Sequence, residues 1–363
     1  MQENKKKTSN KAPVVPIVIL SILLAATIGV LIFIWVRFGS PPSQDQIPKD
    51  MDTYAMDVVV SQNVYGDNAD TAMEEAAKAI NELDDLLAWQ NETSDISKIN
   101  TAAGGTPVTV GSRTIAVLKT ALEVAQKTDG VFDPTILPVS SLWHFDLTAP
   151  QLPSAEEVAK FLPDVGYENL SIDEANSTVT LAKTENALDL GAIGKGAACD
   201  AAIEAYRKAG IQRGIISVGG SSIGTLGEKA SGEAWKIEVQ NPNSKQDNIA
   251  SLGILSMKEG FVSTSGTYIK TFEQDGITYH HILDPKTGYP VQSDLVSVTV
   301  TCDNGALSDA LSTACLSLGI EDAKKLLAEY NAGGIFVDQQ NRVTVTDNLK
   351  DSFQLTAKGF TLA

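Results

Sequence analysis

The sequence predicts an α+β fold in which a single catalytic domain, with mixed β-sheets and flanking helices, follows one N-terminal transmembrane helix. The 363 residues, 43% of them hydrophobic, are enough to bury a substantial core. After residue 50, short β-branched and aromatic runs are mixed with amphipathic helical segments, without a strict strand–helix alternation. An uncharged apolar run of about 20 residues, enough to cross a bilayer, precedes them.

The apolar run, residues 17–37, follows a basic tail, residues 1–16, that contains four lysines. A cleavable signal peptide usually ends in small residues, whereas this run ends in "FIWV", so an uncleaved anchor is favoured. Positive charge stays on the cytoplasmic side, so we expect a single-pass protein of the cell membrane with an extracytoplasmic catalytic domain. Residues 38–50 contain three prolines and are typical of a linker, which leaves 51–363 for the domain.

The charge balance and the cysteines exclude two classes of function. The formal net charge is −17, so no basic stripe is available to neutralise phosphates, and nucleic acid is not expected as a partner. Cys199, Cys302 and Cys315 are too few and too scattered for a disulfide scaffold. Small core residues are the expected role for each cysteine, and pairing of Cys302 with Cys315 is left open.

Several segments have helical periodicity. Apolar residues recur at spacings of three and four in "DTAMEEAAKAINELDDLLAW", and "SRTIAVLKTALEVAQKTDG" predicts a second helix that stops at Gly130. Ser154 and Glu157 form a capping-box pattern at the start of a short helix. Further helices are expected at residues 194–209, 305–318 and 320–330.

Strands are predicted from short β-branched or aromatic runs. The first is "TYAMDVVVSQNVYG", and "NLSIDEANSTVTLAK" predicts two strands joined by a polar turn. The remaining runs are "GIISVGG", "WKIEVQ", "GFVST", "TYIKTFE", "ITYHHIL", "LVSVTVTC" and "GGIFVD".

Two of the three histidines lie in "TYHHIL", directly before the turn "DPKTG". Side chains of a strand alternate, so His281 shares a face with Tyr279 while His280 points the other way. The residue beside the turn is well placed at the mouth of a cleft. Ordinary sheet residues are the alternative, and a zinc site is not supported because no cysteine or further histidine lies at ligand spacing.

A possible magnesium site lies in "NGALSDALSTACLSLG", where Asp309 and Thr313 are four residues apart on one helix face. A carboxylate, a hydroxyl and backbone carbonyls form the hard-oxygen shell that Mg²⁺ prefers. A polar face turned to water is the alternative reading.

Three glycine-rich turns, "DLGAIGKGAACD", "SVGGSSIGTLG" and "STSGTY", could bring backbone N–H groups close to phosphate. Gly191–Gly196 leads into a helix near Lys195 and is a reasonable diphosphate cradle, although glycines that merely end strands are the competing reading. Trp89 stands at a helix end, where an aromatic ring can stack on a planar ligand or simply pack.

Taken in chain order, these motifs resemble the ApbE family, the FAD:protein FMN transferases, over nearly everything after the linker. The matching pieces are "AMDVVV", "LLAWQNETSDISKIN", "FDPTILPVSSLW", "DLGAIGKGAACD", "ISVGGSSIGTLG", "WKIEVQNP", "STSGTYIKTFEQDGITYHHILDPKTGYP" and "SDALSTACLSLG". The "AMD" start and "YHHILDPKTGYP" look most like the Gram-positive branch.

The resemblance implies a reaction in which FAD binds with Mg²⁺ and its FMN phosphate is transferred to a threonine hydroxyl of an acceptor flavoprotein, releasing AMP. It implies that His281 takes the proton of the acceptor hydroxyl, and that Asp309, Thr313 and the carbonyl of Ala192 hold the metal. The residues implied to bind FAD are Met56, Trp89, Asp133, Asp189, Lys195, Gly219, Gly220, Gly266, Asp284 and Thr287. The expected acceptor is a redox protein of the same membrane that carries a threonine flavinylation motif.

The sequence departs from the family at two positions, and two other functions compete. Ser221 and Thr267 stand where many members have a more polar residue, which puts FAD affinity in question more than metal chemistry. A Mg²⁺-dependent FAD pyrophosphatase, with water in place of threonine, is one alternative. A non-catalytic flavin-binding module is the other.

Overall fold

The computed structural model describes residues 27–30, 47–145, 149–244 and 248–363. The chain divides into two units, residues 1–44 and 45–363, and the second contains all the strands and all the helices described except the turn at 27–30. The transmembrane helix expected at residues 17–37 lies outside the described residues except for a short exposed helical turn at 27–30. Among the residues described, none of the helices combines the length and the apolar character needed to span a bilayer.

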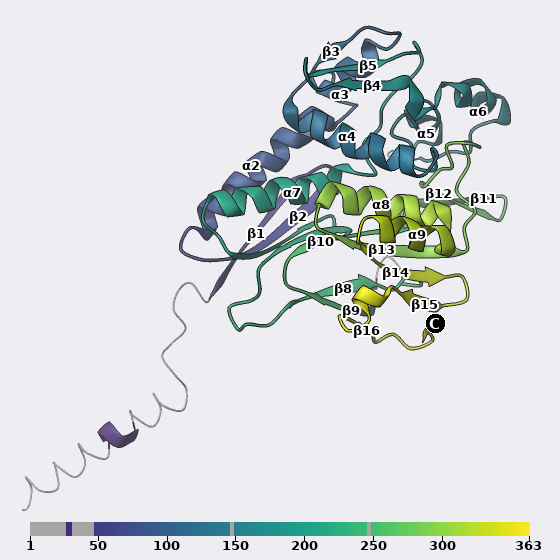
Figure 1. Cartoon of the computed structure of the whole chain (residues 1–363). Helices are drawn as coiled ribbons and strands as arrows, with labels where there is room; N and C mark the ends of the chain where they lie inside the picture. The colour runs from purple at the N-terminus through teal and green to yellow at the C-terminus, as the bar shows by residue number, and fades with distance from the viewer. Residues whose placement is uncertain (1–26, 31–46, 146–148, 245–247) are drawn as a thin grey trace, which may run out of the picture. The chain divides into compact units, whose positions relative to one another are not determined.

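The core of the domain is a sheet in which nine strands are described, in the order β1-β2-β6-β7-β10-β13-β14-β15-β17 (Figure 1). Neighbours are antiparallel, except that β15 and β17 are parallel. The bounds are Pro48–Ala55 (β1), Val58–Tyr65 (β2), Arg213–Val218 (β6), Ser222–Leu226 (β7), Gly260–Gly266 (β10), Leu295–Cys302 (β13), Gly333–Asp338 (β14), Arg342–Val345 (β15) and Thr361–Leu362 (β17).

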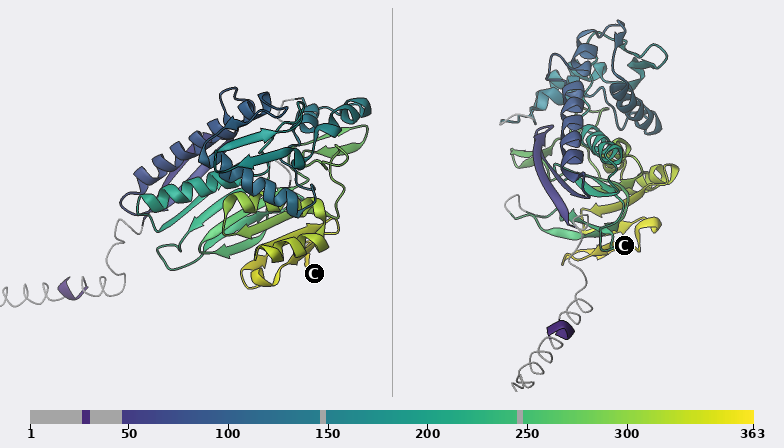
Figure 2. Two further views of the ribbon diagram at one scale, coloured as in Figure 1. Left: turned by 45° about the horizontal axis from the view of Figure 1, so that its top comes forward. Right: turned by 90° about the vertical axis from the view of Figure 1, so that its left-hand side faces the viewer.

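One face of this sheet is covered by four helices that lie side by side (Figures 1 and 2). They are α2 (Ala69–Leu87), α7 (Gly194–Lys208), α8 (Gly305–Leu318) and α9 (Ile320–Glu329). Their apolar stripes and the sheet form the main core, in which Met73, Ile203 and Leu311 are almost wholly buried. The opposite face packs against a small sheet of β8 (Trp235–Gln240), β9 (Ser251–Met257) and β16 (Phe353–Leu355).

A second layer of short elements, residues 95–181, follows α2 in the sequence (Figure 1). It contains α3 (Asp95–Thr101), α4 (Ser112–Lys127), α5 (Leu137–Ser140), α6 (Ala155–Phe161) and a sheet of β3 (Val108–Thr109), β5 (Thr178–Leu181) and β4 (Leu170–Asp173). Short 3-10 turns are Ser141–Trp143, Leu162–Asp164, Tyr167–Asn169 and Asp347–Leu349. A two-stranded sheet of β11 (Thr271–Gln274) and β12 (Ile277–His280) leads to the histidine turn.

Most sequence predictions of secondary structure are confirmed. The α+β class, more than one sheet and the expected helices are present, and the Ser154–Glu157 capping box starts α6. "NLSIDEANSTVTLAK" forms the antiparallel pair β4 and β5. The run "TYIKTFE" is a strand only from Thr271, and the first strand, β1, already starts at Pro48, within the residues expected to form the linker.

The prediction of one strand in "TYAMDVVVSQNVYG" is wrong. The segment is a hairpin, in which Ala55 pairs with Val58 and the two turn residues, Met56 and Asp57, have φ of 52° and 59°. A two-residue turn with positive φ at both positions matches the twist of the flanking strands. Such φ values are uncommon outside glycine, and methionine carries no sequence signal for them. The carboxylate of Asp84 accepts a hydrogen bond from the Met56 N–H at 2.8 Å and holds this turn.

Candidate active site

The first turns of α7 and α8 touch through two glycines. A Cβ on Gly196 would collide with the carbonyl oxygen of Gly305, and a Cβ on Gly305 would collide with the carbonyl oxygen of Gly196. Only glycine fits at both places, so the two backbones approach more closely than side chains would allow. This contact brings the N-terminal end of α7 against the side chain of Asp309 on α8.

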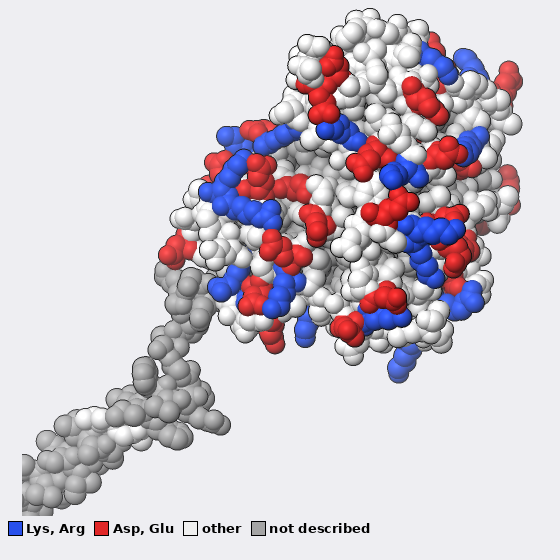
Figure 3. All heavy atoms as spheres, in the orientation of Figure 1, with Lys and Arg blue, Asp and Glu red and all other residues white. Residues whose placement is uncertain are grey.

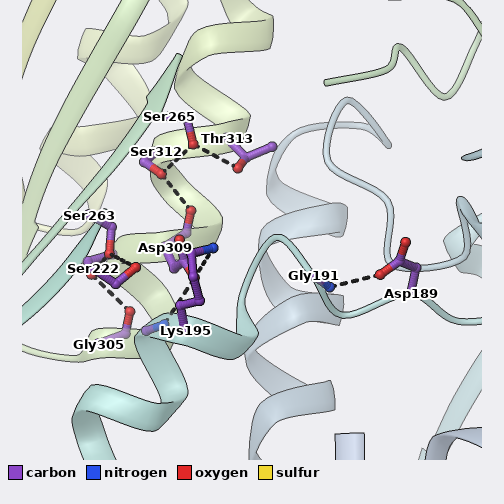
Figure 4. A network of polar contacts seen from close by, with 12 residues as sticks. Asp189, Gly191, Lys195, Ser222, Ser263, Ser265, Gly305, Asp309, Ser312 and Thr313 are labelled. Carbon is purple, nitrogen blue, oxygen red and sulfur yellow. Dashed lines mark hydrogen bonds and ion pairs between the residues drawn. The ribbon is translucent and has the colours of Figure 1, made fainter. Parts of the chain in front are cut away.

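Asp309 is only 3% exposed, and its partners come from α7. The Gly196 N–H donates to Asp309 Oδ2 at 3.0 Å, and the Lys195 ammonium lies 3.8 Å from the same oxygen (Figure 4). The buried carboxylate is therefore held by a helix N-terminus and a cation. A negative group at this place, such as a phosphate brought close to Lys195, would meet the same positive end of α7.

Asp200 fixes the start of α8 and was not singled out from the sequence. Its two carboxylate oxygens accept hydrogen bonds from the N–H groups of Gly305 at 2.7 Å and Ala306 at 2.8 Å. Burial raises the pKa of Asp200, and these two hydrogen bonds oppose the rise. Because the partner is 105 residues away, no local sequence pattern could have identified this cap.

A hydroxyl network ties α8 to β10. Ser265 Oγ lies 3.0 Å from Thr313 Oγ1 and 2.8 Å from Ser312 Oγ, and Ser312 donates to the carbonyl of Asp309 at 2.8 Å (Figure 4). One turn earlier, Ser263 and Ser308 are 2.8 Å apart. The Thr313 hydroxyl is therefore positioned by the sheet as well as by its own helix.

The donor atoms here suit a hard divalent cation. Asp309 supplies a carboxylate, Thr313 one turn later supplies a hydroxyl, and Ala192 lies in the turn just before α7 with a backbone carbonyl. Within the described ranges, no group of three histidine, cysteine or acidic side chains could hold a metal ion. A site that combines one carboxylate with hydroxyl and carbonyl oxygens fits Mg²⁺ rather than zinc.

His281 follows β12 directly, and its ring is held in one orientation. Its Nδ1 lies 2.9 Å from the carbonyl oxygen of Ile269, and the Phe145 ring meets it edge-on at a centroid distance of 6.4 Å. Burial lowers the pKa of His281 to about 4, with further lowering from Lys270 and Lys195. Lys195, which lies 3.8 Å from Asp309, is thus also one of the charges that lower the pKa of His281.

His280 has the structural role that the alternation of the strand predicts. It is 8% exposed, and its Nε2 lies 3.3 Å from the carbonyl oxygen of Val291 on the returning segment. Burial lowers its pKa.

Asp284 and Thr287 shape the turn after His281. Asp284 accepts hydrogen bonds from the Lys286 N–H at 2.8 Å and from the Thr287 hydroxyl at 3.2 Å. Beneath this turn Trp143 is fully buried and donates its Nε1–H to the carbonyl of Gly288 at 3.0 Å. Rings of Phe145, Phe272, Tyr279 and Tyr289 surround Trp143. Sequence reasoning did not assign Trp143, although it lies in one of the quoted motifs.

Three turns that were expected to bind FAD meet at one end of the large sheet. Gly219, with φ of 62°, donates its N–H to the carbonyl of Val59 beside the Met56 turn. Ser221 accepts from the Thr264 N–H at 2.8 Å, so the Gly219-Gly220 turn also adjoins the end of β10. There Gly266 leaves room for the ring of Tyr268, which a Cβ would strike. Met56 and Trp89 are half-buried against the main core.

Asp133 lies in the second layer and Asp189 in the segment that leads from it to α7, and the carboxylates of both organise loops. Asp133 accepts from the Thr135 N–H at 2.8 Å and hydroxyl at 2.7 Å, and from the Tyr167 N–H at 2.8 Å, and burial raises its pKa. Asp189 accepts from the Gly191 N–H at 2.9 Å (Figure 4). These contacts show loop-shaping roles for both residues.

Thr267, one of the two positions that depart from the family pattern, donates its hydroxyl to the carbonyl of Val296 at 3.4 Å.

The chain is similar to curated FAD:protein FMN transferases. An FAD:protein FMN transferase from Klebsiella pneumoniae (strain 342) is 31% identical over 282 residues, which cover 77% of this chain and 86% of the relative. Another from Treponema pallidum (strain Nichols) is 29% identical over 305 residues, covering 80% and 83%.

Solved structures show the same fold. The ApbE protein of Thermotoga maritima has a TM-score of 0.76 and 29% identity, covering 84% of this chain and 99% of its own. The apo form of the Pseudomonas stutzeri flavinyl transferase ApbE also has a TM-score of 0.76, with 26% identity and coverage of 88% and 100%. The ApbE family profile matches residues 56–336, so the chain belongs to the ApbE family.

Proposed function

We propose that this chain is an FAD:protein FMN transferase that uses Mg²⁺ and a threonine hydroxyl of the acceptor protein, and that releases AMP. Transfer of FMN from FAD to a protein is the activity for which the curated relatives are named. The observation that carries the proposal is the contact between His281 Nδ1 and the carbonyl of Ile269. This contact leaves Nε2 of His281 to act as the base, and Asp309, Thr313 and Ala192 would supply the oxygen ligands for Mg²⁺.

The proton transfer follows from the chemistry of the imidazole. A carbonyl oxygen only accepts hydrogen bonds, so Nδ1 carries the hydrogen and Nε2 carries the lone pair. Nε2 takes the proton of the threonine hydroxyl while the threonine oxygen bonds to the FMN phosphorus. The bond from that phosphorus to the bridging oxygen of the diphosphate breaks, and AMP leaves. A positioned general base of this kind contributes about 10²–10⁴-fold to the rate.

Three oxygens of this chain would hold Mg²⁺: the Asp309 carboxylate, the Thr313 hydroxyl and the Ala192 carbonyl. When bound, the ion would neutralise charge on the diphosphate. Lys195 is placed to bind the same phosphates, since its ammonium lies 3.8 Å from Asp309. The Met56 turn and the Gly219-Gly220 turn adjoin each other at one end of the sheet and would bind the rest of FAD.

The location and the partner are also proposals. We place the catalytic domain on the extracytoplasmic side, tethered by residues 17–37, because the apolar run follows four lysines. The acceptor would then be a redox protein of the same membrane. The mixture of positive and negative side chains over one face of the domain, without a continuous basic patch there, fits a protein acceptor better than nucleic acid (Figure 3).

The test is to incubate the full chain with FAD, MgCl₂ and a flavin-free acceptor flavoprotein of one of the relatives. Mass spectrometry should show one covalent FMN on an acceptor threonine and an equal amount of AMP. AMP formed at the same rate without acceptor would support a pyrophosphatase instead. Intact FAD after long incubation with metal and acceptor would support a flavin-binding module.

A further inference from the structure

A cavity of about 670 Å³ lies beside the histidine turn, and the FAD-site residues leave most of it unexplained. Its walls come from β12, from the turn at Asp284 and Thr287, and from Ser317 on α8. Ser317 is one turn beyond Thr313 and donates its hydroxyl to the Thr313 carbonyl at 3.1 Å. The cavity therefore borders both α8, the helix of Asp309 and Thr313, and β12, the strand that leads to His281.

The flavin-site turns do not contribute to this cavity. Of the residues expected to bind FAD, only Asp284 and Thr287 line it, and both have their polar groups engaged in the turn itself. Its volume is that of a pocket for a small ligand or a short peptide segment, and Tyr279 and Gln292 add polar groups to an otherwise mixed lining.

The wall formed by β12 is the edge of a strand rather than one of its faces. Ile277, Thr278 and Tyr279 are consecutive, and side chains of consecutive strand residues point to opposite faces. Three in a row reach one cavity when the cavity runs along the edge. Among the described residues, β11 is the one strand paired with β12, so the other edge offers backbone N–H and C=O groups without a strand partner.

We infer that this cavity receives the threonine-bearing segment of the acceptor protein, in extended conformation along the free edge of β12. The inference rests on the proposed function. β12 ends at His280, and His281 follows it directly, so a segment paired with β12 would end beside the residue that carries the base. From Ile282 onward the chain is already paired with the returning segment, since the Val291 N–H donates to the carbonyl of Ile282. A paired strand lies about 4.8 Å away, and its residues advance about 3.3 Å each, so the segment's last residues come level with the imidazole. Main-chain pairing supplies affinity, and side-chain pockets supply selectivity.

The test uses two positions that face each other across the two-stranded sheet. Ile277 lines the cavity and is 55% exposed, so a lysine there is compatible with folding. Gln274 pairs with Ile277 from β11, is exposed and does not line the cavity, which makes Gln274→Lys the matched control.

In the full chain, with the flavin-free acceptor of one of the relatives as probe, Ile277→Lys should raise the acceptor KM at least tenfold. The kcat and the Kd for FAD, measured by flavin fluorescence, should stay within twofold, and Gln274→Lys should change none of the three. An unchanged acceptor KM in Ile277→Lys would overturn the inference. An equal loss of FAD affinity would also overturn it, because the cavity would then belong to the dinucleotide.

A second measurement separates this inference from the proposed function. Ile277→Cys, labelled with a benzophenone maleimide, should crosslink to the acceptor on illumination and not in the dark. Labelled Gln274→Cys and the labelled unsubstituted chain should not crosslink in either condition. Crosslinking without any FMN transfer would support the docking surface and contradict the transferase proposal. FMN transfer without crosslinking from position 277 would support the transferase proposal and contradict the docking surface.

Discussion

The Nδ1 of His281 lies 2.9 Å from the carbonyl oxygen of Ile269, 12 residues earlier in the chain. This contact selects one tautomer, because the carbonyl can only accept a hydrogen bond. The ring therefore presents an unprotonated Nε2, and burial keeps it neutral.

The first prediction concerns pH. The pKa of His281 is lowered to about 4, so Nε2 stays unprotonated well below the ordinary histidine range. We expect kcat/KM for FMN transfer to hold from neutral pH to about pH 5 and to fall near pH 4. The free energy of unfolding should also decrease as the pH falls from about 6.5 to 4, because the unfolded chain binds the proton of this histidine more readily in that range.

The measurement is a pH profile of kcat/KM with the acceptor, together with urea unfolding at each pH. Lys270→Met should shift the acidic limb to higher pH, because Lys270 contributes to lowering the pKa of His281. An acidic limb near pH 6.5 in the unsubstituted chain would contradict the assigned environment of the base.

The second prediction is that His281→Ala slows transfer by about 10²–10⁴-fold. Binding of FAD should be retained, since the imidazole acts on the acceptor hydroxyl. The matched control is His280→Gln, which alters the neighbouring buried ring and should leave the rate within about fivefold, well below the 10²–10⁴-fold that a general base contributes. Stopped-flow or quenched assays of FMN incorporation measure both variants. Equal losses in the two variants would indicate a packing effect rather than a base.

The third prediction concerns metal binding by α8. Asp309→Asn keeps an oxygen that can accept from the Gly196 N–H, so the fold should survive, but the anionic ligand is lost. In the unsubstituted chain, Mg²⁺ at 100 times its Kd should add about 2.7 kcal/mol to the free energy of unfolding. We expect Asp309→Asn to abolish this gain and Thr313→Val to reduce it. Thermal unfolding with MgCl₂ and with EDTA measures the difference, and an unchanged gain in both variants would exclude this site.

The fourth prediction compares two glycines in the first turn of α7. Gly196→Ala places a methyl group against the carbonyl of Gly305 and should cost about 1–3 kcal/mol of stability through overpacking. A Cβ on Gly194 meets nothing within 4 Å, so Gly194→Ala should be neutral or stabilise by up to about 1 kcal/mol. Urea unfolding of the two variants gives the difference. Similar values would mean that the α7–α8 contact tolerates separation.

Sequence reasoning located the elements and the site motifs because both depend on local patterns. The spacing of Asp309 and Thr313 on one helix and the turn after His281 can be read directly, and the structure contains both the helix and the turn. The missed features are partnerships between distant residues. Asp84 holds the Met56 turn from 28 residues away, and Trp143 supports the histidine turn from 145 residues before Gly288. A carboxylate or a ring that acts through the tertiary fold leaves no periodic signal.

The two contacts from α7 to Asp309 also bear on the order in which the chain would fold and bind Mg²⁺. Many small metalloproteins cannot fold until a cation compensates their clustered ligand charges. Here an amide and an ammonium already contact the single inward carboxylate. Under the proposed function, the polypeptide would therefore reach its native shape first and would recruit Mg²⁺ afterwards, along with the nucleotide. Folding of this protein would then be independent of the supply of magnesium, and only the proposed transfer reaction would require it.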